Sequence, residues 1–170
     1  MKTLLKRMMG AARLDARTYE QVEADSASTG SAILVVFIAS VAAAVGLGST
    51  DLTGIAGVTV AAFLSWAVWI ALTLVIGKWV MPERGTHTNI GEILRTTGFS
   101  ASPGVFRIFA GLPGIGLPIF LGVTVWMLFA FVVAIRQALD YASFNRALAV
   151  CLLGWVIHGL LFFAFVRVAI

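Results

Sequence analysis

The sequence predicts an all-α protein, a polytopic bundle of membrane-spanning helices, on three observations. Of its 170 residues, 60% are hydrophobic and 12% are charged, about half the charged fraction of a soluble domain. The mean hydropathy is +0.99, which leaves too little polar surface to cover a water-soluble fold. Two stretches, 26–50 and 52–77, carry no charge, and each exceeds the roughly 20 apolar residues that cross a bilayer. The chain therefore has room for four or five spans and little else.

The first 25 residues are predicted to form an amphipathic helix on the cytoplasmic side. Their apolar positions recur every three or four residues, which places them on one helical face. Lys2, Lys6, Arg7 and Arg13 would then face lipid phosphates. Alternatively, the helix is cytosolic and packs against the ends of the bundle. We accordingly divide the chain into this segment, 1–25, and a transmembrane bundle, 26–170.

The first two spans are predicted at 31–48 and 53–77, inside the two charge-free stretches. In the first span, Ser40, Ala44 and Gly48 recur every four residues. Small residues at that interval let helix backbones approach closely in lipid. We therefore expect these three residues to form a helix-packing face.

The third span, 91–109, is marginal. Asn89 is a suitable N-cap for a helix beginning there, with a capping-box glutamate three residues later. Only 11 uncharged residues separate Arg95 from Arg107, and Pro103 interrupts them. Both arginines can snorkel outward to lengthen the apolar stretch. The segment either spans the bilayer or is re-entrant or interfacial.

Two further spans are predicted at 117–135 and 147–166. A segment dense in glycine and proline precedes the first of them and indicates a turn. Ala130, Ala134 and Ala138 form a second small-residue face, which we also expect to pack against another helix.

The distribution of basic residues predicts a cytoplasmic N-terminus. With five spans or with four, ten of the 12 basic residues fall on the side of the N-terminus and two on the other. Basic residues concentrate in cytoplasmic loops. The distribution therefore fixes the orientation and leaves the number of spans open.

Three segments resemble one known family. They are Leu14–Asp25 (LDARTYEQVEAD), Leu94–Pro103 (LRTTGFSASP, similar to R-x-x-G-[FY]-[AS]-x-x-P), and Ala134–Tyr141 (AIRQALDY) with the following Arg146–Ala147 pair. In this order they resemble small bacterial integral membrane proteins with a Yip (Ypt-interacting protein) domain. The resemblance covers nearly the whole chain and implies five spans in the bacterial cytoplasmic (inner) membrane. Eukaryotic members interact with small GTPases in vesicle traffic, and only the fold is carried over here.

The sequence shows no pattern that indicates catalysis. It has no P-loop, no H-E-x-x-H and no nucleophile elbow. None of its eight acidic residues lies deep in a confident span, which argues against a proton relay. Only two histidines, His87 and His158, and one cysteine, Cys151, are present. We expect no enzyme, no catalytic residue and no metal site.

His158 is the most notable single residue, because it lies in the middle of a predicted span. Polar groups at that depth are costly unless they have a partner. The residue either forms a hydrogen bond with a neighbouring helix or serves as an axial ligand of a tetrapyrrole. Apart from this possible tetrapyrrole, no cofactor is expected.

Arg95, Arg136 and Arg146 are predicted to lie at the cytoplasmic surface and to contact anionic lipid headgroups or an acidic partner. The alternative is interfacial anchoring, with pairing to Glu92 and Asp140.

The hydroxyl groups near Pro103 also have two interpretations. They satisfy backbone groups that the proline frees, or they line a polar path, because broken helices near the midplane are typical of transporters. The four hydroxyl residues are Thr96, Thr97, Ser100 and Ser102. The tryptophans in the spans, Trp66, Trp69 and Trp126, are interpreted as lipid-facing or packing residues.

The leading functional prediction is a non-catalytic scaffold or membrane-organising protein of Yip-like type. A second hypothesis is an accessory subunit of a larger membrane complex, including one associated with pigment or haem. A third is a small solute carrier with its path at the broken segment. The expected partners are the lipid bilayer and other membrane proteins or a second copy, and no nucleic acid.

Overall fold

The computed structural model describes residues 2–83, 86 and 88–169, and the side chains of these except 162 and 164–169. His87 and Arg84 lie outside the described residues. The described chain is all-helical, which confirms the fold class. Four of its segments are long and apolar enough to cross a membrane: Ser26–Gly46, Leu52–Val80, Gly116–Ala138 and Phe144–Leu161.

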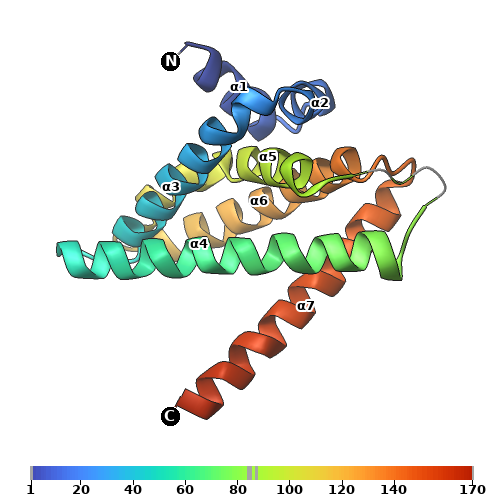
Figure 1. Cartoon of the computed structure of the whole chain (residues 1–170). Coiled ribbons are helices and arrows are strands. Elements are labelled where there is room, and N and C mark those ends of the chain that lie inside the picture. Colours follow the sequence, from blue (N-terminus) through green and yellow to red (C-terminus); the bar gives the residue numbers. More distant parts are fainter. Residues whose placement is uncertain (1, 84–85, 87, 170) are drawn as a thin grey trace.

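The N-terminal segment forms two helices in place of the one expected over 1–25. Helix α1 spans Lys2–Ala12 and α2 spans Ala16–Ala24. The chain turns between them because Leu14 takes a left-handed conformation (φ 62°) and Asp15 caps α2. An amphipathic pattern does not report such a turn. Figure 1 shows both helices, in dark blue, beside the beginning of α3.

The N-terminal pair is fixed to the bundle by specific contacts. Tyr19 and Val22 of α2 are fully buried in one core cluster with residues of α3 and α5. The indole Nε1 of Trp126, on α6, donates a hydrogen bond of 2.7 Å to the carbonyl of Ala12. The segment therefore packs against the other helices, as in one of the two expected arrangements.

The long helices agree closely with four of the predicted spans. After the short 3₁₀ turn η1 (Ser26–Ser28) come α3 (Thr29–Gly46) and α4 (Leu52–Val75), and α4 continues into the π-helical turn η2 (Ile76–Val80). The last two long helices are α6 (Gly116–Ala138) and α7 (Phe144–Ala169). Figure 1 shows the end of α7 (red) extending away from the other helices.

The fifth predicted span, 91–109, is not one continuous helix. Helix α5 spans Ile90–Ser100, and a 3₁₀ helix, η3, follows at Ser102–Gly111. The expected N-cap is confirmed, because Asn89 and Glu92 form a capping box. Pro103 lies in the first turn of η3, where it has no N–H to continue the α-helical ladder of α5. A fifth span is therefore not confirmed by helix length.

Helix α3 and the α5–η3 segment run side by side in the same direction. A Cβ added to Gly98 would lie 2.7 Å from the Cβ of Ala32, and one added to Gly104 would lie 3.0 Å from that of Ala39. At the far end, a Cβ on Gly46 would lie only 1.9 Å from the carbonyl oxygen of Arg107. These contacts place the broken segment along most of the length of α3.

Candidate functional site

The main feature of the bundle is a cavity of about 380 Å³ where its helices converge. Each long helix contributes residues from the middle of its length. The lining residues come from α3 (Val36, Ala39, Ser40, Ala43), α4 (Ala62, Ser65, Trp66, Trp69), the broken segment (Thr97, Ser100, Ala101, Arg107), α6 (Thr124, Val125, Met127, Leu128, Phe131) and α7 (Trp155, His158).

Aromatic side chains form much of the cavity wall. The rings of Trp69 and Phe131 stack with centroids 4.0 Å apart and planes 9° from parallel. Trp66 meets Phe63 edge to face at 6.0 Å. The tryptophans expected to face lipid or to pack in the core are therefore part of this wall in two cases, Trp66 and Trp69. A stacked pair fixes the ring positions and gives the wall a defined shape.

The hydroxyl groups of the broken segment bind backbone carbonyls, as in the first of the two interpretations, while a polar path stays a prediction. Each of the four donates to a backbone carbonyl three or four residues earlier, and the bonds include Thr97 to Ile93 (2.6 Å) and Ser100 to Thr97 (2.7 Å). Two of them, Thr97 and Ser100, also line the cavity. Since their protons are used within the helix, their oxygen lone pairs are what they offer to the cavity.

Arg107 is the cavity residue that sequence reasoning missed. Its Nη2 donates to the hydroxyl of Thr124 at 3.0 Å, and its guanidinium carbon lies 5.0 Å from the ring centroid of Phe120. Its Nε is buried and has no hydrogen-bond partner among the described residues. The indole Nε1 atoms of Trp66 and Trp69 are in the same condition. The sequence gives no local pattern that places Arg107 in a cavity. The cavity itself could have been inferred from α4, where Ser65, Trp66 and Trp69 share one helical face.

His158 lies in the cavity wall and contacts another helix. Its Nε2 is 3.0 Å from the hydroxyl oxygen of Ser65 on α4. This is the hydrogen-bonded alternative for His158. The other alternative, ligation of a tetrapyrrole, stays a prediction and requires either the ring to leave Ser65 or Nδ1 to serve as the ligand.

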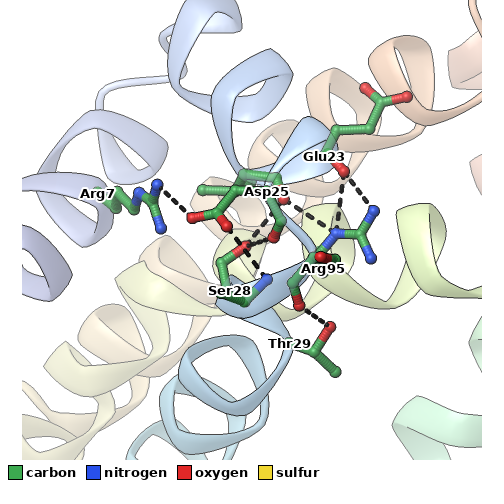
Figure 2. A network of polar contacts seen from close by, with 9 residues as sticks. Arg7, Glu23, Asp25, Ser28, Thr29 and Arg95 are labelled. Atoms are coloured by element: carbon green, nitrogen blue, oxygen red, sulfur yellow. Dashed lines mark hydrogen bonds and ion pairs between the residues drawn. The ribbon is translucent and has the colours of Figure 1, made fainter.

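Arg95, expected at the surface, is only 8% exposed because α2 covers it. Figure 2 shows its guanidinium at the C-terminal end of α2, where it donates to the carbonyl oxygens of Val22 and Glu23. Nearby, Arg7 forms an ion pair of 2.8 Å with Asp25, which lowers the pKa of that carboxyl group. A cation at a helix C-terminus satisfies free carbonyls and the negative end of the helix dipole. Arg95 therefore holds α2 in place and is not available to lipid headgroups.

Arg136 and Arg146 also bind backbone carbonyls. Arg136 donates to Tyr141 and Ala142, both at 3.2 Å, and so closes the end of α6. Arg146 donates to Pro82 at 2.6 Å and lies 3.9 Å from a carboxylate oxygen of Glu83.

The pairs expected in the alternative interpretation are not among the ion pairs of the described residues. Asp140 follows the end of α6 in a left-handed conformation (φ 52°), so it does not continue the helical spacing from Arg136. Contact of Arg136 and Arg146 with lipid or a partner stays a prediction.

Beside Arg136 lies a surface hollow that several acidic groups share, lined by Glu20, Glu23, Arg136, Gln137, Asp140, Tyr141 and Ala142. Burial, and then the nearby carboxylates of Asp140, Glu92 and Glu20, raise the pKa of Glu23 to about 7, against an opposing effect of Arg95. Glu23 is therefore a group that titrates near neutral pH.

The two small-residue faces are mostly buried inside the bundle. Ala44, Ala130, Ala134 and Ala138 are fully buried, and Ser40 is 5% exposed. Gly48 does not take the expected packing role. It lies beyond the end of α3 with φ +88°, and a Cβ there would meet no atom within 4 Å. The closest approach on α3 is made two residues earlier, at Gly46.

No group of three or more His, Cys, Asp or Glu side chains in the described part of the chain is placed to hold a metal ion. Cys151, on α7, is fully buried in a hydrophobic core cluster. In comparisons with known proteins, no family model, no curated protein and no solved structure matches this chain.

Proposed function

We propose that this chain is a small membrane-embedded carrier that binds its solute in the cavity at the break between α5 and η3. The observation that carries the proposal is that cavity, about 380 Å³ in volume and lined by all four long helices and the broken segment. Ligand pockets in proteins measure about 300–1,000 Å³ and combine apolar walls with a few polar groups. This cavity has both properties.

The broken segment favours a carrier function over that of a rigid scaffold. A 3₁₀ helix of ten residues is unusually long, because such helices rarely exceed three or four residues, and they often mark a hinge. Transporters typically place their site near the bilayer midplane at discontinuous helices. Here the break at Ala101 lies in the cavity wall, and the long helices contribute residues from the middle of their lengths.

The proposal includes five crossings, with α5–η3 as the third. Neither α5 nor η3 is long enough alone, but together they cover Ile90–Gly111. Their contacts with α3 run from Ala32 to Gly46, so the segment follows a spanning helix through most of its length. The positive-inside distribution supports a cytoplasmic N-terminus for this arrangement, and the resemblance to the bacterial family supports an inner-membrane location.

The Yip-like scaffold and the accessory subunit stay predictions. Both hypotheses used the small-residue faces as surfaces for partner helices. Most residues of these faces are buried by contacts within this chain and do not lie on its outer surface. For this reason the carrier is the function we favour. The absence of catalysis also stays a prediction.

The first test is binding and flux with the purified protein in liposomes. Because Trp66 and Trp69 line the cavity, a bound solute should change tryptophan fluorescence. We would screen benzoate, benzyl alcohol and benzylamine, with aliphatic analogues of each class. Ala62→Phe fills the cavity from α4 and should abolish binding and flux. Val68→Phe on the same helix, at a position 41% exposed, is the matched control.

Two results would overturn the carrier proposal. One is the absence of any fluorescence change or flux for every solute class with the wild-type protein. The other is equal activity of Ala62→Phe and Val68→Phe, with both variants shown by circular dichroism to be folded.

A further inference from the structure

The unpaired polar side-chain atoms of the described cavity lining are hydrogen-bond donors. Three buried N–H donors have no acceptor within the described part of the chain: Nε1 of Trp66, Nε1 of Trp69 and Nε of Arg107. Indole and guanidinium groups donate and do not accept hydrogen bonds. Buried polar groups in proteins are nearly always satisfied, so each exception needs an explanation. A ligand in the cavity whose acceptor atoms reach Arg107 would satisfy the one donor of the three that belongs to a charged group.

The lining of the cavity also carries a positive charge. None of the residues that line it is acidic, and Arg107 is the one that is always charged. The ion pairs among the described residues are Arg7–Asp25 and Arg146–Glu83, and neither involves Arg107. Its described polar contact is with the neutral hydroxyl of Thr124. That hydroxyl accepts from Arg107, since it donates its own proton to the carbonyl of Phe120 at 2.7 Å.

A guanidinium in a largely apolar wall favours an anion. An unpaired charge in low-dielectric surroundings is costly, and an opposite charge of equal magnitude reduces that cost. A single arginine balances a single negative charge. A carboxylate carries one, whereas a phosphate monoester carries about 1.5 to 2 at neutral pH. The planar fork of arginine also matches the geometry of a carboxylate.

The remaining wall fits an apolar body. The stacked Trp69–Phe131 pair and the side chains of Val36, Met127 and Leu128 offer no charged group and little polar surface. A molecule that is ionic at one end and apolar at the other would place its acceptors at the donors and its body on this wall.

We propose that the cavity takes a small organic monoanion, a carboxylate with an apolar body, whose carboxylate pairs with Arg107 and whose body lies on the aromatic wall. This inference rests on the proposed carrier function and specifies its substrate class. It assigns Arg107 as the anion-binding residue and the stacked Trp69–Phe131 pair as the wall that contacts the apolar body.

The test compares isosteric probes of different charge by tryptophan fluorescence and by calorimetry in detergent. Benzoate should bind at least about tenfold tighter than benzyl alcohol, and benzylamine more weakly than either. Phenyl phosphate should bind more weakly than benzoate, because its second charge has no partner. Decanoate, compared with benzoate, distinguishes a fatty-acid ligand from a compact one; stronger binding of either leaves the carboxylate class intact.

Substitutions at Arg107 give the second arm. Arg107→Gln should remove the preference for benzoate over benzyl alcohol, because no cation remains to pair with the carboxylate. Arg107→Lys should retain part of the preference, because the charge remains and the planar fork does not. Arg17→Gln, at an exposed cation of α2, is the control.

The outcomes separate this inference from the proposal on which it rests. If benzyl alcohol or benzylamine binds as tightly as benzoate, or phenyl phosphate binds more tightly, the cavity binds solutes but the monoanion assignment is wrong. An unchanged preference in folded Arg107→Gln also overturns the assignment. If no probe of any class binds, both proposals fail. The comparison on wild-type protein decides the question even if the variant does not fold.

Discussion

The imidazole Nε2 of His158, on α7, lies 3.0 Å from the hydroxyl oxygen of Ser65, on α4. The two residues are 93 positions apart, and their contact joins two long helices at the cavity wall. A hydrogen bond between side chains contributes about 1 kcal/mol to stability.

We therefore expect a double-mutant cycle of Ser65→Ala and His158→Ala to give a coupling energy of about 1 kcal/mol. The measurement is the free energy of unfolding in detergent, with unfolding monitored by circular dichroism. A cycle of Ser65→Ala with Leu160→Ala, at a residue 64% exposed on α7, should give no coupling. Equal coupling in both cycles would show that the bond between Ser65 and His158 is not responsible.

A second prediction concerns the contact between Gly46 and η3. A Cβ on Gly46 would lie 1.9 Å from the carbonyl oxygen of Arg107, which is backbone and cannot move aside easily. Gly46→Ala should therefore destabilise the protein by about 1–3 kcal/mol, as overpacking does. It should also weaken solute binding, because η3 carries Arg107.

Gly57→Ala is the matched control for Gly46→Ala, because it lies in α4 and its Cβ would meet no atom within 4 Å. That substitution should be neutral or stabilise the helix by about 0.5–1 kcal/mol. Equal melting temperatures for the two alanine variants would contradict the close approach of α3 and η3.

The parts of this fold that the sequence predicted correctly depend on local composition. Runs without charge locate the long helices: the predicted 53–77 and 117–135 correspond to α4 (Leu52–Val75) and α6 (Gly116–Ala138). The capping box at Asn89 was also predictable, because its partners are three residues apart.

The parts that were not predicted depend on contacts between distant segments. Arg95 appeared to be a surface cation, but it binds carbonyls 72 and 73 residues away. The unpaired donors of the cavity come from η3 and α4, and nothing in the local pattern shows that Arg107 lines the same cavity as Trp66 and Trp69. The turn at Leu14 was missed because a left-handed residue leaves an amphipathic pattern unchanged.

A third prediction concerns Arg95 and the N-terminal helices. Its guanidinium supplies hydrogen bonds to two carbonyls at the end of α2. Arg95→Met removes the side-chain donor of the Glu23 carbonyl, whereas the Val22 carbonyl still accepts from the hydroxyl of Ser28 at 2.9 Å. We expect α2 to detach from α5, at a cost of about 1.5–3 kcal/mol for hydrogen bonds from a charged group. Cleavage by a glutamate-specific protease at Glu20 and Glu23 should become faster.

Arg17→Met serves as the comparison for Arg95→Met, since Arg17 is an exposed arginine on α2 itself, and its cleavage rate should match the wild type. If Arg95→Met is cleaved no faster than Arg17→Met, the docking of α2 does not depend on Arg95.

A fourth prediction follows from the raised pKa of Glu23. In the folded protein this pKa is about 7, against an ordinary value of 4.5. Between these values the folded state keeps a proton that the unfolded state has released, so the free energy of unfolding falls as pH rises from about 4.5 to 7. Because Glu23 is partly exposed, solvent screening reduces the effect to about 1 kcal/mol.

Glu23→Gln should therefore be more stable than the wild type at pH 8 and should lose this part of the pH dependence. Asp51→Asn, which keeps an N-cap on α4, should leave the pH profile unchanged. The measurement is thermal unfolding in detergent from pH 4 to pH 8. A wild-type profile that is flat or rises across the window would contradict the sign of the shift.

The last prediction is the side of the membrane on which the α6–α7 loop lies. The α5–η3 segment runs parallel to α3 from Ala32 to Gly46. If α3 crosses outward, the segment also crosses outward, and the loop after α6 returns to the side of the N-terminus. Without that crossing, every later loop would be on the opposite side. Labelling single cysteines with a membrane-impermeant maleimide distinguishes five crossings from four. Cys151 is the one native cysteine, and Cys151→Ala removes it to give a background without cysteine. In that background Ala142→Cys should label from the same side as Lys2→Cys, and Leu112→Cys from the same side as Ser49→Cys. The reverse pattern for Ala142→Cys and Leu112→Cys would leave four crossings, and the broken segment would then be re-entrant.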